Sequence, residues 1–169
     1  MNISVLLPYK ENYSKKIAGA VSLFVNDTVN VSDFKNDITV YGSTDRRDYL
    51  DKNYINLKSD KIFLQSSNKK YVKSFINHKN FKNTDILEIH NRPNYIKQII
   101  QYYDKKIFLY FHNDPLTMNG STSLTDRLFL LEKVDKIIFN SMWSRDRFFL
   151  NLDKNELIKK KNNYLLSII

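Results

Sequence analysis

The chain has 169 residues, a formal net charge of +9 and no cysteine. This length suits one domain with a core of ordinary size, and 42% hydrophobic with 27% charged residues is typical of a globular chain. The lack of cysteine excludes disulfides, cysteine-ligated zinc and a cysteine nucleophile, and it fits a reducing cytoplasm. No apolar run is long enough to span a membrane, and the amino-terminal segment lacks the basic region of a signal peptide.

The positive charge fits three kinds of partner, namely nucleic acid, an anionic membrane and a phosphorylated substrate. Only six of the 27 basic residues are arginine, and the lysines are scattered along the whole chain. Base readout and bidentate phosphate recognition usually depend on arginine. We therefore do not expect nucleic acid as a partner, and most of the lysines are expected to be solvated surface.

Short apolar runs and helical patterns alternate through the first half of the chain. Strands are predicted at Ile3 to Leu7 and at Ile38 to Tyr41, with a weaker one near Tyr54 to Leu57. Between the first two, a helical face is formed by Ile17, Ala20, Val21, Phe24, Val25 and Val29. A second helical face follows at Tyr71, Val72, Phe75 and Ile76.

The second half repeats the alternation more clearly. Strands are predicted at Asp85 to His90, Ile107 to His112 and Lys136 to Asn140. The three helices expected after them have apolar faces at Tyr95, Ile96, Ile99, Ile100 and Tyr103, then at Leu124, Leu128, Leu131 and Val134, and last at Trp143, Phe148, Phe149 and Leu152. Pro93 is a suitable start residue for the first of these helices, and Ser123 or Thr122 is a suitable N-cap for the second.

This alternation predicts βαβ units in an α/β domain over residues 1–152. We expect a Rossmann-like, doubly wound and mainly parallel sheet with helices on both faces. Residues 153–169 are expected to form a charged tail. Because ligands of such sheets bind outside the carboxyl ends of the strands, the residues directly after each strand are the candidates for a site.

Three predicted strand ends carry polar clusters. The clusters are His90-Asn91-Arg92-Pro93, His112-Asn113-Asp114-Pro115, and Asn140-Ser141 followed by Arg145. The first two repeat the order His-Asn-X-Pro and contain two of the three histidines. A neutral histidine can exchange hydrogen bonds with a sugar hydroxyl, asparagine and aspartate give directional hydrogen bonds, and Arg92 or Arg145 can hold a phosphate.

Purely structural interpretations of the same residues remain open. A histidine at a strand end can cap a helix or bond to the core, the prolines can simply end strands, and the arginines can lie on a solvated helix face. Gly19 and Ala20 stand where a helix amino terminus can approach a diphosphate, although no glycine-rich phosphate motif surrounds them. No metal-ligand spacing and no G-x-S-x-G motif occurs, so we expect neither a metal site nor an α/β-hydrolase.

At these clusters the sequence resembles group 1, family 4 glycosyltransferases, which have a GT-B fold of two Rossmann-like domains. The resemblance covers residues 1–152 and rests on Gly19-Ala20, on residues 85–93, on residues 111–115 and on residues 137–148. It implies a cytoplasmic enzyme that transfers a sugar from a nucleotide-sugar donor, with retention, to a glycan or lipid-linked acceptor in polysaccharide biosynthesis. It also implies that the chain is the N-terminal, acceptor-side domain, with a peripheral contact to the inner face of the membrane as a further expectation.

The same resemblance assigns roles to individual residues. His112 matches the histidine beside the transferred sugar and is the candidate catalytic residue. Gly19 and Ala20 match the loop that approaches the donor diphosphate, although the family usually has two glycines there. His90, Asn91 and Arg92 match a segment lining the acceptor side of the cleft, and the remaining candidates for substrate binding are Asn113, Asp114, Asn140, Ser141 and Arg145.

No segment after residue 152 matches the family's second domain, which holds most of the nucleotide-sugar. We therefore expect a chain that is incomplete alone, either a truncated reading frame or one completed by a missing C-terminal domain or a partner chain. No resident cofactor or metal is expected, since the nucleotide-sugar acts as co-substrate. The alternative function is a non-catalytic module that binds a sugar or a phosphate.

Overall fold

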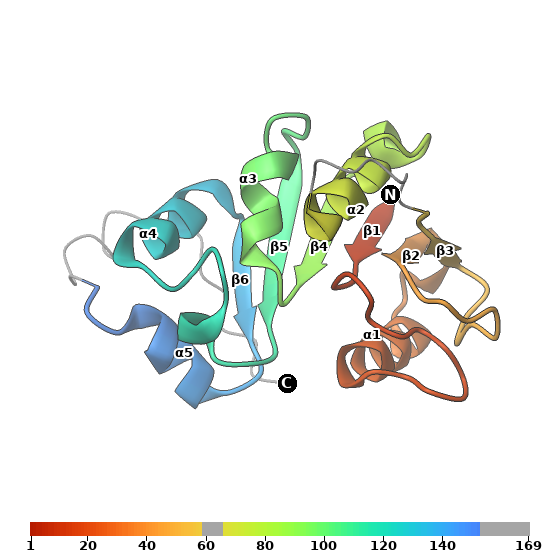
Figure 1. The fold of residues 1–169 in the computed structure, drawn as a ribbon, viewed down its shortest axis with the longest axis horizontal. Helices are drawn as coiled ribbons and strands as arrows, with labels where there is room; N and C mark the ends of the chain where they lie inside the picture. Colours follow the sequence, from red (N-terminus) through yellow and green to blue (C-terminus); the bar gives the residue numbers. More distant parts are fainter. Residues whose placement is uncertain (59–65, 153–169) are drawn as a thin grey trace. The chain divides into compact units, whose positions relative to one another are not determined.

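A computed structural model describes residues 1–58 and 66–152 of the chain. The chain divides into two compact units, Met1–Leu87 and Glu88–Ile169. Strand β4 (Ile86–His90) begins in the first unit and ends in the second (Figure 1). The tail expected at residues 153–169 lies outside the described residues.

The first unit begins with three strands and two α-helices. In chain order these are β1 (Ile3–Leu6), α1 (Ala20–Val31), β2 (Ile38–Gly42), β3 (Tyr54–Asn56) and α2 (Ser67–Ile76). Two short 3-10 helices, η1 (Lys35–Asp37) and η2 (Phe81–Asn83), precede β2 and β4. Strand β1 pairs in parallel with β2, and β2 pairs in parallel with β3.

The second unit continues the alternation. After β4 come η3 (Pro93–Tyr95), α3 (Ile96–Ile99), β5 (Lys106–Phe111), η4 (Pro115–Thr117), α4 (Leu124–Lys133), β6 (Lys136–Phe139) and α5 (Met142–Phe149). Strands β5 and β6 are parallel, and the hydrogen-bonded strand order is β3-β2-β1-β4-β5-β6. The predicted α/β fold with a mainly parallel, Rossmann-like sheet is confirmed.

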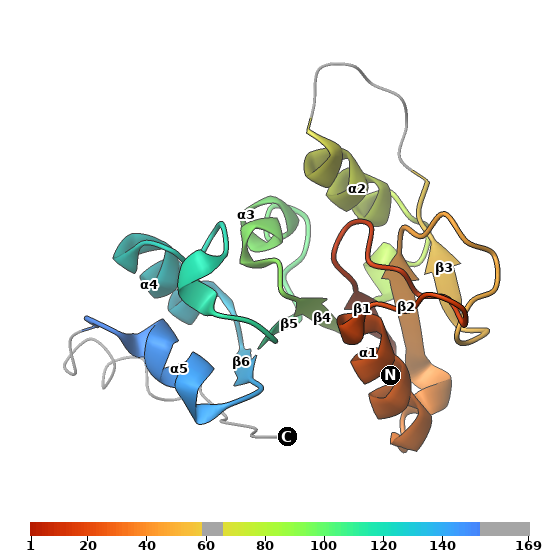
Figure 2. The same cartoon turned by 60° about the horizontal axis from the view of Figure 1, so that its bottom comes forward.

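Helices cover both faces of the sheet in the first unit, as Figure 2 shows for α1 and α2. Odd-numbered β1 residues such as Ile3 and Val5 form one core cluster with Val25 of α1. On the other face, the ring of Tyr41 packs edge-on against Phe75 of α2. This division follows from the period of two along a strand, which sends neighbouring side chains to opposite faces.

Aromatic rings fill the core of the second unit. Phe148 of α5 is fully buried and lies 5.5 Å from both Phe111 and Phe139, measured between ring centroids. Burying a ring of this kind stabilises a fold by roughly 2–3 kcal/mol. The high aromatic content of the sequence therefore serves packing in this unit.

Three of the predicted helices begin or end elsewhere. Helix α1 starts at Ala20, so Ile17 lies before it and is 51% exposed. Helix α3 ends at Ile99, although Tyr103 is buried as its spacing predicted. Helix α5 ends at Phe149, before Leu152, and the chain then turns at Asn151, which has a left-handed φ of 62°.

Candidate functional site

The strand-end clusters of the second unit come together as predicted for the carboxyl edge of a parallel sheet. His90 is the last residue of β4, His112 directly follows β5, and Asn140 directly follows β6. The structure joins these three residues by hydrogen bonds, which are described in turn below.

The two histidines form a direct pair. Nδ1 of His90 and Nε2 of His112 are 2.8 Å apart, and the two rings are stacked with centroids 5.1 Å apart. The ring of His90 also stacks on that of Tyr110, with centroids 4.5 Å apart. His90 is 2% exposed, so its ring is fixed between two neighbours and in turn fixes the ring of His112.

Glu88 lies near the buried edge of His90, with its Oε2 3.9 Å from Nε2 of His90. Either ring nitrogen in the bond between the histidines can be the donor, depending on the tautomers. A carboxylate near Nε2 of His90 favours the tautomer that carries its proton there. In that tautomer Nδ1 of His90 accepts the hydrogen bond from Nε2 of His112, and the lone pair of His112 is on Nδ1.

The environment keeps His112 neutral. Burial, and to a smaller extent the neighbouring His90, lower the pKa of His112 to about 4. Burial and the nearby Glu88 raise the pKa of Tyr110, so the phenol also stays neutral. At neutral pH the site thus offers an uncharged imidazole, which suits a hydroxyl ligand better than a phosphate.

Two asparagines hold the backbone of His112 from both sides. Oδ1 of Asn91 accepts a hydrogen bond from the His112 N–H at 2.7 Å, and Nδ2 of Asn140 donates one to the His112 carbonyl at 2.8 Å. Asn91 is 3% exposed and has a left-handed φ of 53°, a conformation that asparagine tolerates better than most residues. Asn91 and Asn140 therefore position His112.

Asp114 is engaged inside the protein. Its carboxylate accepts a hydrogen bond from the Leu116 N–H at 3.0 Å and is paired with Arg147, whose Nη2 lies 2.9 Å away. The hydrogen bond from Arg147 lowers the pKa of Asp114. In this structure Asp114 therefore organises the loop after β5.

The remaining candidates of the second unit have varied surroundings. Ser141 accepts a hydrogen bond from the Ser144 N–H and caps α5. The guanidinium of Arg92 donates to the carbonyl of Asn91, and that of Arg145 bonds to the adjacent Asp146. Asn113 is exposed directly beside His112.

Gly19 and Ala20 belong to the first unit, where Gly19 is the N-cap of α1. A Cβ at position 19 would overlap the carboxylate of Glu11, and Oε1 of Glu11 accepts a hydrogen bond from the Ser22 N–H at 3.2 Å. The amino end of α1 thus already has an anion from the chain itself. The glycine provides the space for that carboxylate.

Sequence reasoning missed Glu88, Tyr110 and Arg147 as members of the site. Glu88 and Tyr110 each stand two residues before a histidine of the pair, and residues two apart in a strand share a face. That spacing was the available signal. The pairing of Arg147 with Asp114 joins residues 33 positions apart, and no local pattern indicates it.

Neither a metal cluster nor a membrane span occurs in the described parts of the chain. Within residues 1–58 and 66–152, no three His, Asp or Glu side chains are grouped so that they could hold a metal ion. No helix in these ranges is both long and apolar enough to cross a bilayer.

Solved structures match the fold of this chain. Sucrose-phosphate synthase from Thermosynechococcus elongatus matches 99% of the chain with a TM-score of 0.64 and 13% identity, over 48% of its own length. The chain has the Rossmann-like α/β fold of about half of that enzyme. A second structure of that enzyme, of which 89% is covered, matches with a TM-score of 0.61 and 10% identity. UDP-N-acetylglucosamine 2-epimerase matches with a TM-score of 0.51 and 11% identity, over 98% of this chain and 48% of that one.

The chain therefore spans about half the length of the full-length structures that it matches. At such low identity the similarity shows the fold alone. No protein-family model matches the chain, and no curated protein sequence matches it. Membership of family 4 thus stays a prediction from the motifs.

Proposed function

We propose that this chain is the acceptor-side half of a family 4 glycosyltransferase, which transfers a sugar from a nucleotide-sugar to a glycan or lipid-linked acceptor. The observation that carries the proposal is the His90–His112 pair, with its neutral His112, at the carboxyl edge of a GT-B-type sheet. Sugar hydroxyls bind to directional hydrogen-bonding partners, and this pair supplies one. The strand-end motifs support the same function.

In the proposed reaction, an acceptor hydroxyl oxygen forms a bond to C1 of the donor sugar with retention. The bond from C1 to the diphosphate oxygen breaks, and the nucleoside diphosphate leaves with the electron pair and takes up the hydroxyl proton. His112 is a poor base at neutral pH because its pKa is about 4. Its proposed role is therefore to accept a hydrogen bond on Nδ1 from a hydroxyl of the transferred sugar, and to orient that sugar.

Of the residues around His112, some are proposed to contact the substrate and others to hold His112 in position. Asn113, Arg92 and Arg145 are proposed to contact the substrate, because each extends from a strand-end segment next to the pair. Asn91 and Asn140 act through the backbone of His112. Glu88 and His90 act through its ring.

The proposed enzyme needs a second Rossmann-like domain, on the same polypeptide or on a partner chain, to bind most of the nucleotide-sugar. It needs no metal, since arginine, lysine and helix termini can neutralise a diphosphate. A cytoplasmic location with a peripheral contact to the inner face of the membrane fits the +9 charge. Each of these points is part of the proposal.

The test is a binding and turnover screen with UDP-glucose, UDP-galactose, UDP-N-acetylglucosamine and GDP-mannose. Calorimetry and detection of released nucleoside diphosphate are applied to the chain alone and with its donor-binding domain. In the active form, His112→Ala should lower turnover about a hundredfold through loss of sugar orientation, more than its loss of stability, about 1–3 kcal/mol from the unpaired His90, can explain. The matched control is His78→Ala, since His78 lies in the first unit; equal turnover for both variants would remove His112 from the mechanism.

One observation favours the alternative, a sugar-binding module without turnover. Glu11 occupies the amino end of α1, where the resemblance places the donor diphosphate, and a carboxylate there repels a phosphate. A module would bind acceptor glycans through the His112 edge and would show no nucleotide-sugar affinity in any form. Glu11→Gln restoring donor binding would instead support the enzyme.

A further inference from the structure

A second polar site lies in the first unit, at the amino ends of the strands. Strands of a parallel sheet are normally apolar on both faces, because helices cover both. Ser4 of β1 and Thr39 of β2 break this rule, and they are direct partners in the strand register. Two neighbouring strands thus place a hydroxyl at the same level of the sheet.

These hydroxyls lie on the face that α1 does not cover. Ser4 and Thr39 alternate with Ile3, Val5, Ile38 and Val40, which all belong to the core cluster with α1. On the opposite face, α2 packs against Tyr41 through Phe75. Three polar residues of the segment before β4, namely Asn80, Asn83 and Thr84, line the same pocket as Ser4.

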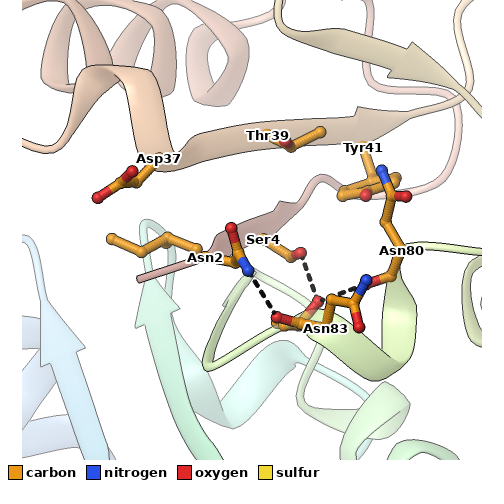
Figure 3. A pocket seen from close by; sticks show the side chains of 9 residues that line it. Asn2, Ser4, Asp37, Thr39, Tyr41, Asn80 and Asn83 are labelled. Carbon is orange, nitrogen blue, oxygen red and sulfur yellow. Dashed lines mark hydrogen bonds between the residues drawn. The ribbon is translucent and has the colours of Figure 1, made fainter.

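The result is a pocket of about 220 Å³ within the first unit. Figure 3 shows side chains from β1, β2 and the η2 segment around one hollow. The lining residues are Asn2, Ile3, Ser4, Asp37, Thr39, Tyr41, Asn80, Asn83 and Thr84.

The lining has the chemistry of a polyol site. It contributes hydroxyls, carboxamides and one carboxylate, and no lysine, arginine or histidine side chain. Hydroxyls and carboxamides both donate and accept, as sugar hydroxyls do. The carboxylate of Asp37 disfavours a phosphate, although the chain's amino terminus lies 3.9 Å from that carboxylate and offsets part of its charge.

Part of the lining is held in place by bonds that leave other groups directed at the hollow. The hydroxyls of Ser4 and Thr84 are 2.8 Å apart and buried. Nδ2 of Asn2 donates to the Asn83 carbonyl at 3.1 Å. These bonds fix the walls, so a ligand would meet a preformed site.

We propose that this pocket binds an uncharged monosaccharide or cyclic polyol, with Thr39, Asn80 and Asp37 as its hydrogen-bonding side chains. The site is separate from the His112 edge and does not depend on glycosyl transfer. If the chain is a glycosyltransferase half, this pocket would bind a second sugar unit besides the one at His112. If it is not, the pocket would still be a sugar-binding site.

The experiment is a titration of the ¹⁵N-labelled full chain, followed by amide chemical shifts in NMR. Glucose, N-acetylglucosamine and myo-inositol are compared with inorganic phosphate. At least one of the three polyols should give saturable shifts at residues 2–4, 37–41 and 80–84, with a dissociation constant on the order of 1 mM. Phosphate should give none at these residues.

Two substitutions and a control make the result specific. Thr39→Val keeps the shape of a β-branched side chain and should weaken polyol binding about tenfold, as should Asn80→Ala. Thr28→Val is the control, because Thr28 lies on α1 and bonds to the carbonyl of Phe24. The proposal is overturned if no polyol gives saturable shifts at the pocket, if phosphate binds there as tightly, or if the control weakens binding equally.

Discussion

The hydrogen bond between His90 and His112 allows a quantitative test of the candidate site. His90→Phe keeps an aromatic ring against Tyr110 and removes both ring nitrogens. The pKa of His112 is lowered from 6.5 to about 4, first by burial and second by His90. Because the substitution removes only the second cause, we expect the pKa of His112 to rise and still stay below 6.5.

The same shift predicts how stability depends on pH. As pH falls from 6.5 to about 4, the unfolded chain takes up a proton at His112 and the folded chain does not. Stability is therefore lost on acidification through this window, at 1.36 kcal/mol per pKa unit, which gives an upper limit of roughly 3 kcal/mol. Partial exposure of His112 makes the real loss smaller, and the loss in His90→Phe should be smaller again.

Two measurements decide the outcome. NMR titration of the His112 ring gives its pKa in both proteins, and denaturant unfolding at several pH values gives the stability. The ¹⁵N shifts of the wild-type ring should also show the proton of His112 on Nε2. An unchanged pKa in His90→Phe would contradict the effect of His90 on His112. A His112 proton on Nδ1 would refute the arrangement derived from Glu88, and His78→Phe should leave His112 unaffected.

Substitutions at Asn91, Arg127 and Asp114, with Arg145 as a control, probe the supports of the fold and the site by denaturant unfolding. Asn91→Gly should cost about 1–2 kcal/mol through its lost hydrogen bond, and Asn91→Ala about 1 kcal/mol more because of the left-handed φ; equal losses would contradict a backbone role. Arg127→Met should cost about 2–4 kcal/mol, because the buried guanidinium donates to the carbonyls of Phe148 and Leu150 at the end of α5. Arg145→Met should change stability by less than about 0.5 kcal/mol. Asp114→Asn should cost under about 1 kcal/mol at pH 7. Because Arg147 lowers the pKa of Asp114 below 3.8 in the folded chain, the stabilisation from this pair is present above pH 3.8 and is lost as the pH falls through the folded pKa. A variant that loses stability in acid as much as the wild type does would contradict this.

The strands were predictable from sequence because a buried parallel strand is a short, almost continuous apolar run. Ile107 to His112 was predicted as a strand, and β5 is Lys106–Phe111. Helix ends were less predictable, since they depend on distant partners. Helix α5 stops where Arg127 binds the carbonyls of Phe148 and Leu150, and nothing near Phe149 in the sequence indicates a bond to α4.

The position of the site at the carboxyl edge of the sheet was predictable from the sequence, but the roles of its individual residues were less so. The rule for parallel sheets placed His90 and His112 together, and the structure joins them. The sequence could not distinguish residues facing a ligand from residues that hold the backbone, because Asn91 and Asn140 have the same side chain as the exposed Asn113. The pocket around Thr39 was missed because a single polar residue in a strand carries little signal.

The carboxylate of Glu11 occupies the amino end of α1 and would compete with any anion for that position. Any phosphate that binds there must first displace Glu11 from the Ser22 N–H. Its apparent affinity is then the intrinsic affinity multiplied by the fraction of molecules in which Glu11 has already left. A dissociation constant measured for a free nucleotide would thus report on the strength of an internal hydrogen bond as much as on the ligand.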